Sequence, residues 1–291
     1  MVVPFAPGGP VDREARLYSA KMGDLLTKAL IVDYKPGAGT SIGSSFVAKS
    51  RPDGHTLLIN TTSYTAMAAF YKDIGFDPVD DMSFISLMKR TPSIVIVHPS
   101  FPATNFREYI AYAKANPDKI NVGNSGIGAT GHLALIWLAN LTDTKVTLVH
   151  YKGAGPQIAD LVAGRLDSSI VGLQAALALI KAGKVRPLAV TGSGRSRVIP
   201  ALPTIAESGV PEFNYANWSG IFAPSAVPSA VLVRLNEIFN KLAKNPEVAS
   251  PLEADGSVME GTTSAAFRKV IIEEIPRWSK IVSEAGVVPG E

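Results

Sequence analysis

Short apolar segments alternate with amphipathic stretches along this chain, and this alternation constrains the fold more than any other sequence feature. Three strand-like and two helical segments occupy the first third: residues 2–5, 31–34 and 56–60 for strands, and residues 12–29 and a stretch from about residue 41 for helices. The first helix is expected to bury one face at i+3 and i+4 spacing, with Asp12 as its N-cap. This order predicts an α/β fold with a mostly parallel sheet flanked by helices.

A second series of the same kind occupies the middle of the chain. Its expected helices cover residues 105–115, 130–141, 156–163 and 175–181, and its expected strands cover residues 120–123, 146–150, 168–171 and 185–190. The end of the chain is expected to be helical from residue 229 and again over residues 263–284, where Pro276 should interrupt the helix.

The late helices must pack on a unit that is already built, so the chain is predicted to cross twice between two lobes. Lobe 1 is expected to consist of residues 1–98 and 222–291, and lobe 2 of residues 99–221. Two crossing segments would form a hinge, with a ligand cleft between the lobes.

Charge and composition exclude several classes of protein. The formal charge is +3, and the basic residues are scattered singly, so a nucleic-acid partner is not expected. The chain has no cysteine, which excludes thiolate zinc sites and a cysteine nucleophile. No apolar run approaches the roughly 18 residues needed to span a bilayer, so stable membrane insertion is not expected. No signal peptide is visible, and an exported protein would have lost its signal from this sequence.

The glycines of NSGIGATGHL, residues 124–133, have the G-x-G-x-x-G spacing of a dinucleotide-binding turn. A strand is expected before them and a helix after them, but the next strand ends in His150, Tyr151 and Lys152 without the carboxylate that would hold a ribose hydroxyl. Lys152 could accompany a 2′-phosphate, which leaves an NADP-dependent enzyme as an alternative function. In either case the turn can bind an anion, because a helix N-terminus offers unpaired N–H donors.

GTSIG, residues 39–43, matches the G-x-S-x-G spacing of a hydrolase nucleophile elbow. An elbow serine follows its strand directly, whereas three residues intervene here, so Ser41 is interpreted as a cap of the next helix and hydrolysis as an alternative function. The four histidines have no metal-binding spacing and are interpreted as packing or surface residues. The sequence therefore predicts no catalytic residue, no metal site and no cofactor.

Five loops rich in glycine, serine and threonine follow expected strands. They are PFAPGGPVD (4–12), KPGAGTSIG (35–43), NTTSYT (60–65), NSGIGATG (124–131) and YKGAGPQ (151–157). Ligands of open α/β sheets bind at the carboxyl ends of strands, where these loops lie. Backbone N–H groups, hydroxyls and helix N-termini can hold a carboxylate, and no acid, base or nucleophile is poised to react with it.

The ordered set of motifs resembles the Bug-type periplasmic solute-binding receptors of tripartite tricarboxylate transporters. The matching segments are VPFAPGG (3–9) with Asp12 and Arg16, PGAG (36–39), PDGHTLL (52–58), GIG (126–128) with His132 and Leu133, YKG (151–153), Asp160 and Leu161 with Gly164 and Asp167, PT (203–204) with Glu207 and Gly209, and WSG (218–220) with AP (223–224). The likeness covers nearly the whole chain.

The resemblance implies a two-lobed Venus-flytrap fold that captures a small organic carboxylate or dicarboxylate and delivers it to the membrane subunits of the transporter. It further implies a periplasmic location and a monomer, and a sensor that docks on a signalling partner is a further hypothesis. One end of the ligand would be held by Phe5, Gly8 and Gly9, partly through ordered water, and a carboxylate would be held by residues 125–130. The full predicted set of ligand-binding residues is Phe5, Pro7, Gly8, Gly9, Asp12, Thr40, Thr61, Ser63, Ser125, Gly128, Ala129, Thr130, Ala154 and Gly155.

The chain departs from the family pattern at Val171 and Gly172, where related receptors often carry an Asp-Asn type pair. This departure suggests a ligand that is less polar, or aromatic.

Overall fold

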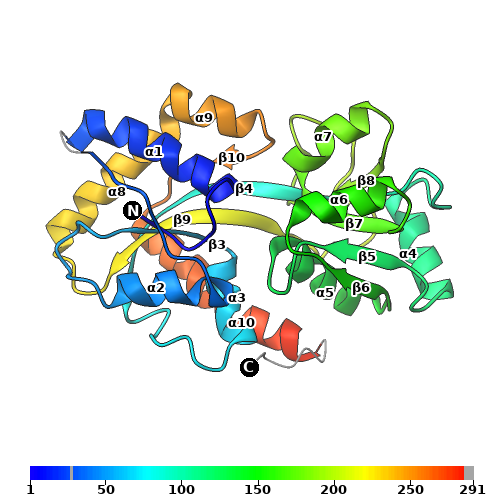
Figure 1. Cartoon of the computed structure of the whole chain (residues 1–291), viewed down its shortest axis with the longest axis horizontal. Coiled ribbons are helices and arrows are strands. Elements are labelled where there is room, and N and C mark those ends of the chain that lie inside the picture. The colour runs from blue at the N-terminus through cyan, green and yellow to red at the C-terminus, as the bar shows by residue number, and fades with distance from the viewer. Residues whose placement is uncertain (27–28, 285–291) are drawn as a thin grey trace. The chain divides into compact units, whose positions relative to one another are not determined.

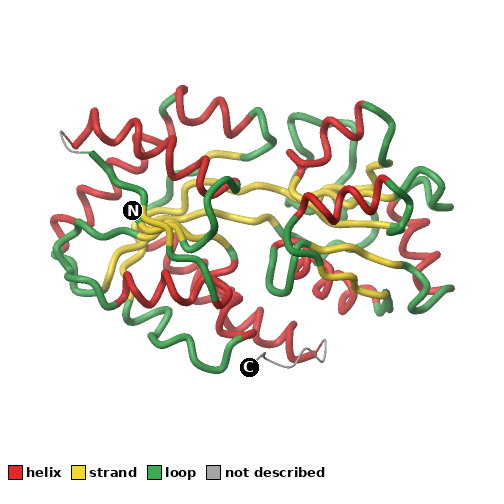
Figure 2. Tube along the Cα trace, viewed as in Figure 1, coloured by secondary structure: helices red, strands yellow, loops and turns green. Residues whose placement is uncertain are grey.

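The computed structural model describes residues 1–26 and 29–284, which form an α/β fold (Figures 1 and 2). The chain divides into two compact units: unit 1 comprises Met1–Arg90 and Trp218–Glu291, and unit 2 comprises Thr91–Asn217. It passes from unit 1 to unit 2 within strand β4 (Met82–Val97) and returns within strand β9 (Ala216–Pro224). The predicted lobe boundaries at residues 98/99 and 221/222 stay a prediction.

Unit 1 is built on a mixed sheet. Its strand order is β2 (Asp33–Tyr34), β1 (Val2–Val3), β3 (Leu58–Thr61), β9 and β4, and β10 (Val258–Met259) pairs with β4. Strand β1 runs parallel to β2 and β3, whereas β3 pairs antiparallel with β9. The parallel strands are those joined by helical crossovers, and the antiparallel pairs involve the strands that connect the units.

Helices cover both faces of the unit 1 sheet (Figure 1). On one face lie α1 (Pro10–Leu26), α8 (Ser229–Lys244) and α9 (Pro246–Glu253). On the other lie α2 (Ser41–Ala48), which follows the short 3-10 helix η1 (Ala38–Thr40), α3 (Ser63–Phe70) and α10 (Ser264–Glu284). Two separate hydrophobic cores result, as expected when a sheet is covered on both faces.

The two cores of unit 1 are packed around aromatic rings. In the first, the Tyr18 ring meets the Phe239 ring edge to face, with centroids 6.2 Å apart. In the second, Trp218, Phe222 and Phe267 contact one another, with the Phe222 and Phe267 centroids 5.0 Å apart. Gly220 lies between Trp218 and Phe222, and a Cβ added there would overlap the Phe267 ring. A glycine is therefore required in the WSG segment, because the α10 ring packs directly on the β9 backbone.

Unit 2 contains the second half of β4, which pairs antiparallel with β7 (Ser168–Gly172) and β8 (Arg186–Val190). Strand β5 (Asn121–Asn124) is parallel to both β7 and β6 (Thr147–His150). Helices α6 (Ala154–Val162) and α7 (Leu173–Lys181) cover one face, and α5 (Thr130–Thr142) covers the other (Figure 1). Helix α4 (Phe106–Ala115) begins after Asn105, whose side chain accepts the Glu108 N–H.

Several local predictions are wrong. Helix α10 runs through Pro276 without interruption, because Ile271, Trp278 and Ile281 are buried on both sides of the proline and hold the helix in place. Residues 63–70, whose beginning was predicted as a loop, form α3; their segment SYTAMAAF carries no charge and is buried almost all round, so it has no amphipathic period. Strand β4, which is 16 residues long, is not among the predicted strands.

The starts of two helices also differ from prediction. Helix α1 begins at Pro10, so Asp12 lies inside its first turn and is not the N-cap. Proline is well suited to this place, because the first helical N–H has no acceptor within the helix. Helix α2 begins at Ser41 itself, and its N-cap is Thr40, which has a left-handed conformation with φ 85° and makes no capping side-chain bond. Helix α1 is predicted to end at residue 29 and is described as far as Leu26. Residues 27 and 28 lie outside the described part of the chain.

Candidate functional site

In unit 1, the predicted site residues gather at one edge of the sheet. Strands β1, β2 and β3 are parallel, so the loops that follow them leave from the same edge. The β1 loop carries Phe5, which is half-buried, and Pro7 and Gly8, which are exposed. Predicted residues from the β2 and β3 ends join them at this edge.

Asp12 anchors the β1 loop. Its carboxylate accepts hydrogen bonds from the Gly8 N–H at 2.7 Å, from Arg16 Nε at 2.7 Å and from the Tyr34 hydroxyl at 2.6 Å. The hydrogen bond from Tyr34, followed by that from Gly8, lowers the pKa of Asp12. The carboxylate therefore stays ionised and holds Gly8, which has φ 90°, in place. Asp12 shapes the predicted ligand loop from within the protein.

Thr40, Thr61 and Ser63 lie at the ends of η1 and β3 and at the start of α3. Thr40 and Thr61 are buried, and Ser63 is half-buried. The Thr40 hydroxyl accepts from Asn60 Nδ2 at 3.1 Å, and the Asn60 Oδ1 accepts the Thr61 N–H at 2.8 Å. Asn60 thus ties the β3 end to the η1 turn. Of the three predicted residues, Ser63 has the side chain that reaches solvent most readily.

In unit 2, the turns after β5 and β6 lie side by side. Asn124 and His150 are register partners at the ends of these parallel strands. The Tyr151 N–H donates to the Asn124 carbonyl at 2.9 Å, and the Gly153 N–H donates to the Ser125 carbonyl at 3.2 Å. The structure therefore brings the predicted residues of the first turn, Ser125, Gly128, Ala129 and Thr130, next to those of the second, Ala154 and Gly155.

Residues 125–130, called here the donor turn, lead directly into α5. Gly126 and Gly128 have φ values of 132° and 73°, in the region that favours glycine. The first turn of α5 follows, where N–H groups have no acceptor within the helix and the helix dipole is positive. A carboxylate at this position would meet several N–H donors and the hydroxyl of Thr130, which is half-buried.

The third glycine of the motif, Gly131, packs α5 against β7. A Cβ added at Gly131 would lie closer than 3.0 Å to the carbonyl oxygen of Ile170. In dinucleotide-binding turns the last glycine has the same purpose of close helix–strand packing. The turn therefore shares the backbone geometry of such motifs, while the β6 end lacks their acidic residue.

Three buried polar residues near these surfaces were not predicted as functional. Beneath the donor turn, Asn124 and His132 are 0% and 2% exposed, and His132 Nδ1 accepts the Gly128 N–H. The sequence signal is a histidine four residues after Gly128 in an otherwise apolar helix, a pattern that is also typical of a packing residue. In unit 1, Glu14 is 1% exposed and forms an ion pair with Lys89 at 3.1 Å.

Glu14 also accepts hydrogen bonds from the Tyr18 hydroxyl at 2.7 Å and the Ser219 hydroxyl at 2.5 Å. Lys89 lies on β4 and Ser219 on β9, so one buried carboxylate on α1 binds both strands that continue into unit 2. No local sequence pattern points to this cluster, because its members are up to 205 positions apart.

The residues of the alternative catalytic interpretations are not arranged for catalysis. Ser41 is buried at the start of α2 and does not follow a strand directly, as an elbow serine would. Within residues 1–26 and 29–284, no group of three or more His, Asp or Glu side chains could hold a metal ion. Tyr151, at the end of β6, donates its hydroxyl to Asp160 at 2.7 Å and stands where a ribose-binding acid would be needed.

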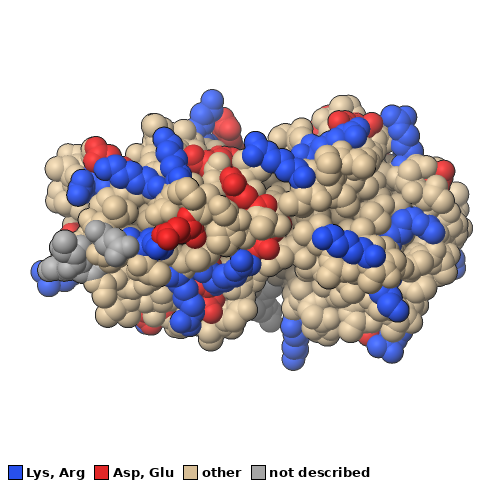
Figure 3. Space-filling view, turned by 90° about the horizontal axis from the view of Figure 1, so that it is seen from above, with Lys and Arg blue, Asp and Glu red and all other residues tan. Residues whose placement is uncertain are grey.

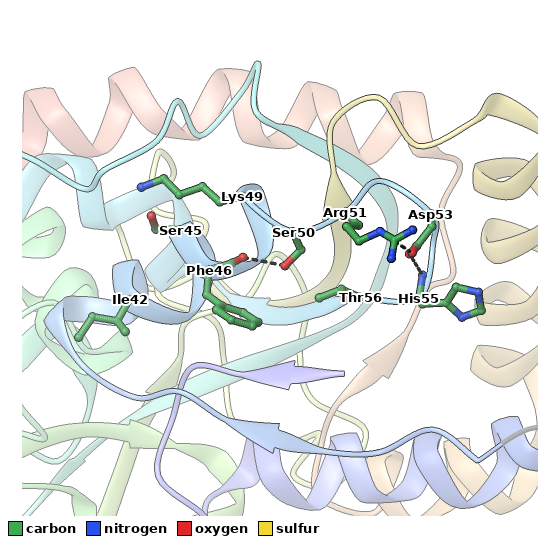
Figure 4. A pocket seen from close by; sticks show the side chains of 9 residues that line it. All are labelled: Ile42, Ser45, Phe46, Lys49, Ser50, Arg51, Asp53, His55 and Thr56. Carbon is green, nitrogen blue, oxygen red and sulfur yellow. Dashed lines mark hydrogen bonds and ion pairs between the residues drawn. The ribbon is translucent and has the colours of Figure 1, made fainter.

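A hollow of about 660 Å³ lies on the outer side of α2 (Figure 4). It is lined by Ile42, Ser45, Phe46, Lys49, Ser50, Arg51, Asp53, His55 and Thr56. The Arg51 guanidinium lies 3.9 Å from the Asp53 carboxylate, which also accepts the His55 N–H. These contacts neutralise part of the positive charge, and the hollow contains none of the predicted ligand-binding residues.

The surface charges match the expectation from composition. On the face shown in Figure 3, lysines and arginines are interspersed with acidic residues and do not form one continuous basic patch. As for the membrane, no helix in the described part of the chain combines the length and apolar character needed to cross it.

Comparison with known proteins identifies the class of protein. A family model described as "Tripartite tricarboxylate transporter family receptor" matches residues 14–287. The structure of Rpa4515 from R. palustris with adipate is 34% identical, with a TM-score of 0.85 and coverage of 98% of this chain and 96% of that one. The periplasmic binding protein BugD is 32% identical, with a TM-score of 0.83 and coverage of 99% and 97%. MatC from Rhodopseudomonas palustris with bound malate is 29% identical, with a TM-score of 0.82 and coverage of 97% of each chain.

The fold and these similarities define a solute-binding protein of the periplasmic-binding-protein class. The chain belongs to the family of tripartite tricarboxylate transporter receptors. The α/β fold and the resemblance to Bug-type receptors are confirmed, and the family consists of receptors, not of enzymes.

Proposed function

We propose that this receptor binds a small organic dicarboxylate in the periplasm, as a monomer and without catalysis, and delivers it to the membrane subunits of a tripartite tricarboxylate transporter. The observation that carries the proposal is the donor turn, where two glycines with positive φ lead into the N-terminus of α5. Backbone donors of this kind favour a negatively charged group. The adipate and malate bound to two related receptors support a carboxylate as the ligand.

Each unit carries predicted ligand-binding residues of its own. In unit 2 the donor turn and the first residues of α6 are proposed to hold a carboxylate. In unit 1 the loop of residues 5–9, fixed by Asp12, and the half-buried Ser63 are proposed to bind a carboxylate as well.

Isothermal titration with adipate, malate, a monocarboxylate and an uncharged diamide tests the proposal. We expect at least one dicarboxylate to bind and the diamide not to bind. Thr130→Val removes a hydroxyl from the start of α5, and Ser63→Ala removes one from the start of α3. Each should weaken binding about tenfold or more, because a hydrogen bond to a charged group contributes about 1.5–3 kcal/mol.

Thr147→Val is the matched control for Thr130→Val. Thr147 begins β6, at the end of the strand opposite the donor turn, and its hydroxyl donates to the Asp118 carbonyl at 3.0 Å. This variant should bind as the wild type does. Absence of binding to every carboxylate in the panel would contradict the proposed function, and equal weakening by all three variants would contradict the proposed site.

Two further measurements address the rest of the proposal. Titration with NADPH should give no binding, whereas micromolar binding that is lost in Gly128→Val would favour the dinucleotide alternative. Light scattering after size exclusion should give the mass of one chain, with and without the bound dicarboxylate.

A further inference from the structure

A chain of polar side chains lies directly beneath the donor turn. Asn124 Oδ1 accepts the Gly126 N–H at 3.1 Å and lies 3.0 Å from His150 Nδ1. His132 Nδ1 accepts the Gly128 N–H at 3.1 Å, and its ring meets the His150 ring edge to face, with centroids 5.2 Å apart. The buried side chains of Asn124 and His132 therefore accept hydrogen bonds from the N–H groups of both glycines with positive φ.

These contacts separate two sets of N–H groups. Those of Gly126 and Gly128 are occupied by Asn124 and His132, and the Ala129 N–H donates to the Gly126 carbonyl at 3.2 Å. The N–H groups of Thr130 and Gly131, the first two residues of α5, are the proposed donors for an external anion, because helix geometry leaves them without an intrahelical acceptor. The buried side chains of Asn124 and His132 thus hold the N–H groups of the two glycines inside the protein.

His132 can accept the Gly128 N–H only while its Nδ1 carries no proton. The side chain is 2% exposed, and its burial, with a smaller contribution from the neighbouring His150, lowers the pKa of His132 to about 4. At neutral pH the ring is therefore uncharged, and the hydrogen bond from the Gly128 N–H requires the tautomer whose proton is on Nε2. The position is also specific, because His132 lies on the first turn of the same helix whose N–H groups would meet the ligand.

We propose that His132 is a positioning residue of the carboxylate site: its Nδ1 holds Gly128, and through Gly128 it holds the donor turn in the conformation that binds the ligand. This inference rests on the proposed function and adds a role for a residue that does not touch the ligand. Gly128 has φ 73°, so the turn depends on restraints beyond the intrinsic preference of its backbone. Loss of the Nδ1 acceptor would leave a partly buried N–H unpaired and the turn free to rearrange.

The test uses two substitutions of similar branched shape, of which only one keeps a hydrogen-bond acceptor. His132→Asn keeps an acceptor, Oδ1, near the position of Nδ1, whereas His132→Leu keeps the volume and removes the acceptor. With adipate as the probe in calorimetric titration, His132→Asn should bind within about threefold of the wild type. His132→Leu should bind about tenfold or more weakly.

Leu138→Ala is the control for general destabilisation. Leu138 is buried on the same helix, two turns beyond His132, and a cavity there should lower the melting temperature without changing the affinity for adipate. If His132→Leu binds adipate as tightly as the wild type, or if Leu138→Ala weakens binding equally, the positioning role is overturned.

A second measurement needs no ligand. Nitrogen-15 NMR of the histidine rings in the full-length protein should show His132 with an unprotonated Nδ1 at pH 7, and amide exchange at Gly128 should be faster in His132→Leu than in His132→Asn. A proton on Nδ1 of the wild type would overturn the inference even if adipate binds. Failure of the wild type to bind any carboxylate would instead contradict the proposed function, while the NMR result would still decide how Gly128 is held.

Discussion

Replacement of Gly131 by alanine should destabilise unit 2, although alanine is the better helix former. The added Cβ would lie 2.4 Å from the Ile170 carbonyl oxygen, while ordinary contacts begin at 3.4 Å, so α5 or β7 must move by about 1 Å. Both are backbone elements and cannot rotate away as a side chain can. Overpacking of this kind costs roughly 1–3 kcal/mol. The helix preference of alanine over glycine returns at most about 1 kcal/mol.

Thermal unfolding followed by circular dichroism measures the difference. A net loss of about 1–2 kcal/mol should lower the melting temperature by roughly 2–8 °C for a domain of this size. Gly155→Ala is the matched control, because Gly155 also lies in the first turn of a helix in unit 2 and an added Cβ there meets nothing within 4 Å. This control should be neutral or slightly stabilising. An unchanged or higher melting temperature for Gly131→Ala would refute the reasoning from close packing.

Three other predictions concern stability. Glu14→Gln should lower the free energy of unfolding in urea by about 3–5 kcal/mol, because Lys89 is left buried without its partner. Adding Lys89→Met should recover part of this loss. A double variant no more stable than Glu14→Gln would argue against the ion pair. The wild type should lose stability as the pH falls from 6.5 to about 4, since unfolded His132 binds a proton in this range and folded His132 does not. The pKa difference of about 2.5 between the two states corresponds to roughly 3 kcal/mol. In thermal unfolding, His132→Asn should show a flatter pH dependence than the wild type. Pro276→Ala should raise the melting temperature, because α10 is continuous there and proline costs up to about 3 kcal/mol inside a helix. A lower melting temperature would contradict this reasoning.

Much of the secondary structure could be predicted because its causes are local. The strands and helices of residues 105–190 lie within two residues of their predicted ends, since amphipathic period, glycine turns and an N-cap such as Asn105 act over a few positions. The errors have a common cause. Helix α3 is buried on nearly all sides and lacks a polar face, and α10 continues through Pro276 because distant residues pack around it. Tertiary packing prevailed over local preference in both cases.

The candidate site, too, could be predicted from the sequence only in part. Loops after parallel strands could be predicted to meet at one sheet edge, because strand direction follows from the order of the elements. The hydrogen-bond partners of Asp12 could not be predicted from the sequence. Its carboxylate binds Gly8, Arg16 and Tyr34, and the last of these comes from a different strand.

Three features can be deduced from neighbouring residues alone: the α/β class, the glycine-rich turns before helices and the absence of the acid that a dinucleotide requires. The pairing of buried polar groups depends instead on the packed fold. Glu14 binds Lys89 and Ser219, which are 75 and 205 positions away, and such contacts depend on how strands and helices pack. His132 is only four positions from Gly128, but their hydrogen bond exists because the turn has positive φ values and the helix is buried against β7. In a buried environment an unpaired polar group is costly, so the packed fold specifies its partner, whereas the sequence shows only that the group is polar.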